Sequence, residues 1–222
     1  MKRISLYFLT LFFVLSYSVQ AQISSDRKTM SEGVYEALVI EIPGLNKKTT
    51  SKLWTDFTKD FYSSRSKYNR KTKEYFTDDV DIAGIGKGNT IDIYTSIAEK
   101  SGGSELSMWI DLGGSFLSRS EHGDRYVEAE KMLIRFGLEG AKEKIRLDIE
   151  DQEKTLKGLG RDLEKLATAK ERYESDIEKA KQMITEAEQG IIDNTTLQEA
   201  KNKEITAQED LIETTKKKLN DL

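Results

Sequence analysis

Few residues of this chain have the types and spacing that catalysis requires. His122 is the only histidine, and catalysis by imidazole generally needs a companion base, acid or metal ion. It lies in a polar segment that precedes a predicted helix, where a surface or capping role is the favoured interpretation. Because the chain has no cysteine, the sequence excludes disulfides, thiol catalysis and thiolate metal sites.

The glycine-rich segment Gly84–Thr90 resembles a phosphate-binding loop only superficially. A Walker-type loop has four residues between its first glycine and the Gly-Lys pair, followed by Ser or Thr and then a helix. In this chain Lys87 is followed by Gly88 and then by a predicted strand. A glycine-rich connection between two strands is therefore the favoured interpretation.

Aspartates are the best candidates for ligand chemistry. Asp78, Asp79 and Asp81 come close together, and Asp92 and Asp111 lie on neighbouring predicted strands. Such carboxylates could bind a hard cation such as Ca²⁺ or act as a pair in hydrolysis. Their spacing does not match an EF-hand loop, and solvated turns and strand faces explain them better. We therefore expect no catalytic residues, no metal ligands, no cofactor and no enzymatic activity.

A possible ligand face consists of Tyr94 and Trp109 together with Asp92 and Asp111. These residues alternate with apolar ones along two predicted strands, so they lie on the sheet face opposite the apolar one. If the chain binds a small ligand, this is where we expect it. The alternative, which we favour, is that a linker or a partner chain covers this face.

The elements that would position these residues form a predicted α+β head domain over residues 33–140. Val34–Ile42 reads as an inner strand that ends at the only proline, and Asn46–Tyr62 reads as an amphipathic helix. Three extended segments follow, at residues 73–82, 89–98 and 105–112, and a helix begins near Asp124. The pattern predicts a small antiparallel sheet in β-α-β-β-β-α order with helices on one face.

Residues 141–222 are predicted to form a coiled-coil stalk. Stepping by seven from Ile149 gives a line in which only Lys170 and Gln198 are neither Ile nor Leu. A second line, three residues further on, contains Leu159 and Leu166 near its start and polar residues later. A stripe that keeps this 3-4 spacing needs another helix to bury it. We call the first line the seam, and its candidate interface residues are Leu156, Leu163, Ile177, Ile184, Ile191, Ile205 and Ile212.

One stretch could interrupt this helix. Poor helix formers follow one another from Gly190 to Thr196, and residues 196–199 fit a capping box. The seven-residue spacing nevertheless continues through the stretch without a shift, which favours one long helix over a helical hairpin. Neither the number of associating helices nor their direction follows from the seam alone.

The first residues are typical of a secretory signal peptide. Lys2 and Arg3 precede an apolar run, and Val19-Gln20-Ala21 places small residues before a cleavage site. We expect residues 1–21 to be removed, residues 22–32 to form a flexible tail, and the mature protein to be periplasmic or secreted, with no transmembrane anchor. With 39 acidic against 35 basic residues of mixed distribution, a nucleic-acid partner is not expected.

The chain resembles uncharacterised secreted bacterial proteins that join a small α+β head to a C-terminal coiled coil. The resemblance rests on the Val19–Gln22 signal-peptide ending, on Trp109–Leu117 and on the Glu- and Lys-rich heptads, and it implies no activity. Two functions are therefore expected. The first is an exported, non-catalytic interaction or scaffolding protein that uses its coiled coil to bind itself or another envelope protein. The alternative is a ligand-binding module for a small molecule, peptide or envelope component, with the coiled coil as a spacer.

Overall fold

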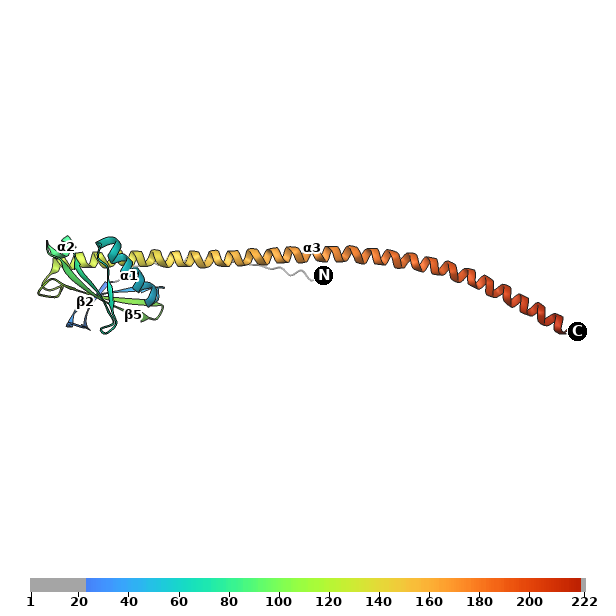
Figure 1. The fold of residues 1–222 in the computed structure, drawn as a ribbon, viewed down its shortest axis with the longest axis horizontal. Coiled ribbons are helices and arrows are strands. Elements are labelled where there is room, and N and C mark those ends of the chain that lie inside the picture. Colours follow the sequence, from blue (N-terminus) through green and yellow to red (C-terminus); the bar gives the residue numbers. More distant parts are fainter. Residues whose placement is uncertain (1–22, 221–222) are drawn as a thin grey trace. The chain divides into compact units, whose positions relative to one another are not determined.

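A computed structural model describes residues 23–220 (Figure 1). The predicted signal peptide, residues 1–21, lies outside the described residues. The chain divides into two compact units, Met1–Asp151 and Gln152–Leu222, and each is described by itself. The predicted α+β class is confirmed.

The first unit is built on one six-stranded antiparallel sheet with the order β1-β2-β6-β5-β4-β3. The strands are β1 (Ile23–Met30), β2 (Gly33–Pro43), β3 (Lys67–Asn69), β4 (Glu74–Val80), β5 (Ile91–Lys100) and β6 (Gly103–Asp111). Helix α1 (Lys47–Tyr62) follows β2, and the single turn α2 (Ala83–Gly86) lies between β4 and β5. Strand β2 is flanked by β1 and β6, so the prediction of an inner strand for this segment is confirmed.

The main core lies on one face of the sheet. Alternate residues of β2, β5 and β6 point to this face, among them Leu38, Ile93 and Met108, all fully buried. Helix α1 contributes Trp54 and Phe57, and the first turns of the last helix, α3, contribute Tyr126, Ala129, Met132, Leu133 and Phe136. The ring of Trp54 packs edge-on against that of Phe136, with centroids 5.1 Å apart. Both helices thus cover the same face, as the sequence predicts, because one helix cannot cover a sheet of this width.

Both long helices begin at or next to their predicted starts. Asn46 is the N-cap of α1, and its side-chain oxygen accepts a hydrogen bond from the backbone N–H of Thr49 at 2.9 Å. Helix α3 (Gly123–Asn220) begins one residue before the predicted start. It continues without a break through Gly190–Thr196, so the preference for one helix over a hairpin is confirmed.

The opposite face of the sheet has a small core of its own. Met30, Ala37, Val39 and Trp109 are buried there, with Tyr35, Tyr94 and Phe116 packed against them. The turn between β1 and β2 folds over this face, since the backbone N–H of Ser31 donates a hydrogen bond to Glu74 of β4 at 2.9 Å. Two-sided burial explains why β2 is apolar in both alternating sets at its centre, with Ala37 and Val39 on one face and Leu38 and Ile40 on the other.

Residues 22–32, which the sequence predicts to be a flexible tail, contain strand β1. It pairs in antiparallel register with β2, from Ile23 opposite Ile40 to Met30 opposite Gly33. The strand is polar and mostly exposed because it is an edge strand with few side chains in a core. Its stability comes from pairing with a distant segment, and the local sequence carries no signal of that pairing.

The second unit consists of residues 152–220 of α3. Every side chain from Gln152 to Lys218 is exposed, apart from Gly158 and Ala169, which are half-buried. Within the described residues this unit therefore has no core of its own. No helix of the described part of the chain is long and apolar enough to cross a membrane.

Candidate functional site

The aspartates that the sequence singles out are partly brought together. One carboxylate oxygen each of Asp78, Asp79 and Asp92 lies within 4.8 Å of the others. The register of β4 against β5 shifts between Thr77 and Val80, and Asp79 there has a left-handed φ of 50°. Its backbone N–H donates to Asp92 Oδ1 at 3.0 Å, and its own carboxylate accepts from Thr90 Oγ1 at 2.9 Å.

This acidic cluster has unfavourable electrostatics within the protein alone. The pKa of Asp92 lies above its ordinary value, chiefly because burial disfavours the carboxylate, and also because Asp78, Asp79 and Asp111 carry like charges. The backbone hydrogen bond from Asp79 opposes the shift. A divalent cation could bridge the three carboxylates. However, Asp78 and Asp79 are exposed, and the hydrogen bonds of Asp79 account for the arrangement without an ion.

The four residues of the possible ligand face share one side of the sheet. Asp92 is opposite Asp111, and Tyr94 is opposite Trp109, across β5 and β6. Trp109 is only 1% exposed and belongs to the small core. Phe116, in the linker before α3, stacks on Tyr35 with ring centroids 3.9 Å apart and lies near Tyr94. The linker and the β1–β2 turn thus pack over the aromatic pair, and Trp109 is not available at the surface. The sequence favours cover by the linker or a partner chain and does not predict the part played by the β1–β2 turn.

Lys28, Glu105 and Lys100 form a group of ion pairs on the sheet. Lys28 of β1 contacts both Glu105 at 2.5 Å and Ser107 at 3.0 Å, and Lys100 contacts Glu105 at 2.8 Å. Partial burial acts to raise the pKa of Glu105, but hydrogen bonds and charges from Lys100 and Lys28 outweigh it, so the pKa lies below its ordinary value. This group links β1 to β6 through charged hydrogen bonds.

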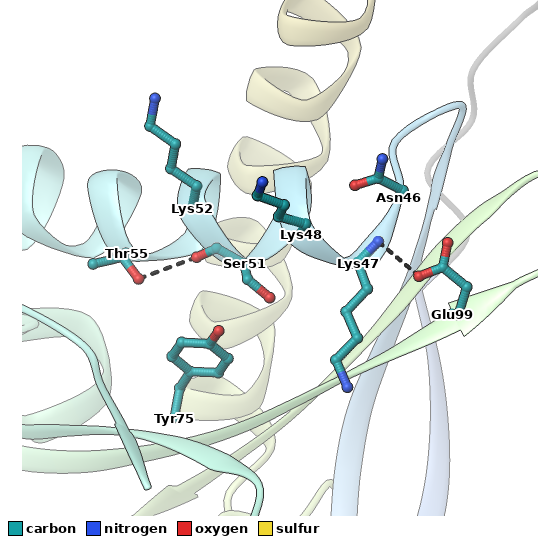
Figure 2. A pocket seen from close by; sticks show the side chains of 8 residues that line it. All are labelled: Asn46, Lys47, Lys48, Ser51, Lys52, Thr55, Tyr75 and Glu99. Carbon is teal, nitrogen blue, oxygen red and sulfur yellow. Dashed lines mark hydrogen bonds between the residues drawn. The ribbon is translucent and has the colours of Figure 1, made fainter. Parts of the chain in front are cut away.

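The best-defined concavity of the described residues lies elsewhere, beside the start of α1 (Figure 2). It is shallow and open, with a volume of about 710 Å³. Tyr75 lies across from α1 and Glu99 closes one end, where it accepts a hydrogen bond from the backbone N–H of Lys47 at 3.0 Å. The other lining residues are Asn46, Lys48, Ser51, Lys52 and Thr55.

Sequence reasoning missed this concavity because Tyr75 and Glu99 come from β4 and β5, far from α1 in the chain. Its lining includes three lysines and one glutamate, and no lining residue has a buried side-chain polar atom without a hydrogen-bond partner. It is an open polar surface.

The other two candidates have structural roles. His122 Nδ1 accepts a hydrogen bond from the backbone N–H of Ser118 at 3.3 Å, and its carbonyl accepts from Tyr126 at 2.8 Å. The His122 side chain thus closes the turn before α3 and does not bond to the N–H groups of the helix, whereas the sequence favours a surface or capping role. The glycine-rich segment forms α2 and a turn, with Ile85 buried in the main core.

The seam is the most extensive candidate surface. Leu156, Leu163, Ile177, Ile184, Ile191, Ile205 and Ile212 all lie on α3 and are 45 to 70% exposed. On the second line Leu159, Leu166 and Tyr173 are also exposed, at 62 to 68%. Large apolar side chains repeated at this spacing on one helix are typical of an interface, because a solitary helix gains nothing from them.

The rest of the second unit stabilises the helix locally. Ion pairs at i, i+3 or i, i+4 spacing follow one another, including Lys170–Glu174, Glu178–Lys181 and Lys201–Glu204. Each contributes a few tenths of a kcal/mol in an exposed helix. These pairs favour the helical conformation but leave the apolar surface in water.

Comparison with known proteins adds no relative to this description: no family model, no curated protein and no solved structure matches the chain.

Proposed function

We propose that this chain is an exported, non-catalytic interaction or scaffolding protein that associates through the seam of α3. One observation carries the proposal: seven Ile and Leu side chains at seven- or fourteen-residue spacing are exposed on a unit that has no core within the described residues. Full burial of such a side chain stabilises by about 1.5–3 kcal/mol. Association is the way for this helix to obtain that stabilisation.

The export part of the proposal rests on the sequence of residues 1–21, whose basic start, apolar run and small residues before Ala21 fit a secretory signal peptide. The non-catalytic part rests on the candidate residues of the head: Asp79 and Asp92 are hydrogen-bonded within the β4–β5 region, and His122 is hydrogen-bonded to the backbone of Ser118.

The proposal is tested by the mass of the chain in solution. The chain without residues 1–21 is passed over a size-exclusion column coupled to light scattering at several concentrations. We expect a mass above that of one copy, rising with concentration. A mass of one copy throughout, together with no retained protein when the immobilised chain is exposed to an envelope extract, would refute association through the seam.

A further inference from the structure

We propose that the seam binds a second copy of this chain, and that the two copies pair in antiparallel orientation with Ile184 facing the partner's Ala187. This inference rests on the proposed function, since it requires self-association. It adds that the partner is a second copy of the chain, that the two helices run antiparallel, and which residues face one another.

The apolar layers fit this register. In an antiparallel pair, a residue of the seam faces a residue of the second line of the partner. Leu159 then faces the partner's Ile212, Leu166 faces the partner's Ile205, and Ala180 faces the partner's Ile191. The part of the second line that is apolar, near residues 159–166, thus meets the part of the seam that lacks apolar neighbours, near residues 205–212. The seam residues Leu156, Leu163 and Ile177 face the partner's polar Thr215, the partner's Gln208 and the partner's Asn194.

The flanking charges also fit. The residues that come one position after each second-line residue flank the interface and face one another in an antiparallel pair. In this register Lys181 faces the partner's Glu188, and Glu153 faces the partner's Lys216. By symmetry each pair occurs twice. No flanking position on either side of the seam meets a like charge in this register.

The registers one heptad away and the parallel pair bring like charges together. A shift by one heptad in one direction places Glu174 opposite the partner's Glu188, and a shift in the other direction places Glu188 opposite itself. A parallel pair in register places Glu204 opposite the partner's Glu209. Like charges at such positions weaken pairing and so select among registers.

One layer of the proposed register contains two lysines, Lys170 and the partner's Lys201. Each is already paired within its own helix, Lys170 with Glu174 at 3.6 Å and Lys201 with Glu204. The two lysines and their two glutamate partners therefore carry no net charge together. Long lysine side chains can also direct their amino groups outward to water from such a position.

Disulfide trapping tests direction and register, because the chain has no cysteine and each introduced one is the only thiol. Leu159→Cys and Ile212→Cys chains are equilibrated in a glutathione buffer, separately and mixed, and the products are identified by mass spectrometry. We expect a disulfide only in the mixture, joining one chain of each kind. Circular dichroism checks that both variants keep their helix.

The outcomes separate this inference from the proposed function. A disulfide in Leu159→Cys alone would overturn the antiparallel register and leave self-association intact. No disulfide in any sample, with a mass of one copy, would overturn both.

A charge cycle gives a second, independent readout. Lys181→Glu and Glu188→Lys should each weaken dimerisation about tenfold, because two attractive pairs become repulsive, and the double variant should restore it. Lys179→Glu is the matched control, since this exposed residue lies off the seam and pairs within its helix with Asp176 at 3.8 Å. Failure of the double variant to recover affinity would contradict the pairing of residues 181 and 188.

Discussion

Replacing Ile184 by Asp is the perturbation whose effect follows most directly from the structure. Ile184 is 58% exposed on the helix, so more than half of its side chain remains to be buried on association. Full burial of an Ile stabilises by about 1.5–3 kcal/mol, and the remaining surface is thus worth about 1–2 kcal/mol per copy. In the variant a carboxylate must also leave water or hold the helices apart, which costs at least about 1 kcal/mol more per copy.

In a dimer both terms count twice, so the variant should lose about 4–6 kcal/mol of association free energy. Since about 1.4 kcal/mol corresponds to a factor of ten, the dissociation constant should rise by a factor on the order of a thousand or more. Sedimentation equilibrium at micromolar concentrations measures this as conversion to one copy. The head should be unaffected, because Ile184 lies in the second unit.

Gln182→Asp is the matched control. Gln182 is exposed and lies two residues away, off the seam, so it introduces the same carboxylate and a comparable loss of helix propensity without entering the interface. The control should associate like the unmodified chain. If Ile184→Asp and Gln182→Asp associate equally well, the seam is not the interface and the reasoning from exposed apolar residues is wrong.

Three predictions concern the first unit. Glu105→Gln should remove part of the acid sensitivity of folding. The pKa of Glu105 is lowered in the folded state, so its carboxylate stabilises the fold fully above the unfolded pKa of about 4.3. This stabilisation is lost as the pH falls through the lowered folded-state pKa. Urea midpoints from pH 3 to 7 measure the difference, and an unchanged slope with pH would contradict the role of Lys28 and Lys100. Gly103→Ala should destabilise the head by about 1–3 kcal/mol, because the new Cβ would lie 2.4 Å from the carbonyl oxygen of Ile42. Gly123→Ala is the control, since a Cβ there meets nothing within 4 Å. Equal melting temperatures of the two variants would refute this prediction. Trp54→Ala should cost about 3–5 kcal/mol of unfolding free energy, since Trp54 is fully buried against Phe136, while Phe61→Ala, at a residue 48% exposed, should cost much less; denaturant unfolding followed by circular dichroism compares them.

The elements with a strong local period are the ones that the sequence predicts well. The alternation in β5 and β6, the aromatic spacing in α1 and the seven-residue spacing in α3 each repeat within one segment, so the strand or helix and its apolar face can be read from that segment alone. The coiled coil itself stays a prediction. The position of α1 and of the start of α3 on the same sheet face follows from the width of the apolar face.

The features that the sequence does not reveal depend on contacts between distant segments. Strand β1 is polar and holds its place by pairing with β2, and β3 is a three-residue exposed strand. The burial of Trp109 depends on the β1–β2 turn folding across to Glu74 and on Phe116 from the linker. The concavity beside α1 likewise combines Tyr75, Glu99 and the helix. The charges around Trp109 and Tyr94 suggest a ligand face in the sequence, whereas the three-dimensional packing makes this pair part of a core.

Hydrogen exchange along α3 is the measurement that tests the central claim most directly. The second unit has no core of its own in the described residues, and an exposed helix opens locally with little protection. If association buries the seam, amide protection over residues 152–218 rises strongly between submicromolar and high micromolar concentrations, while protection of the head does not change. Protection over these residues that is the same at all concentrations would contradict the claim that this helix is held by a second copy.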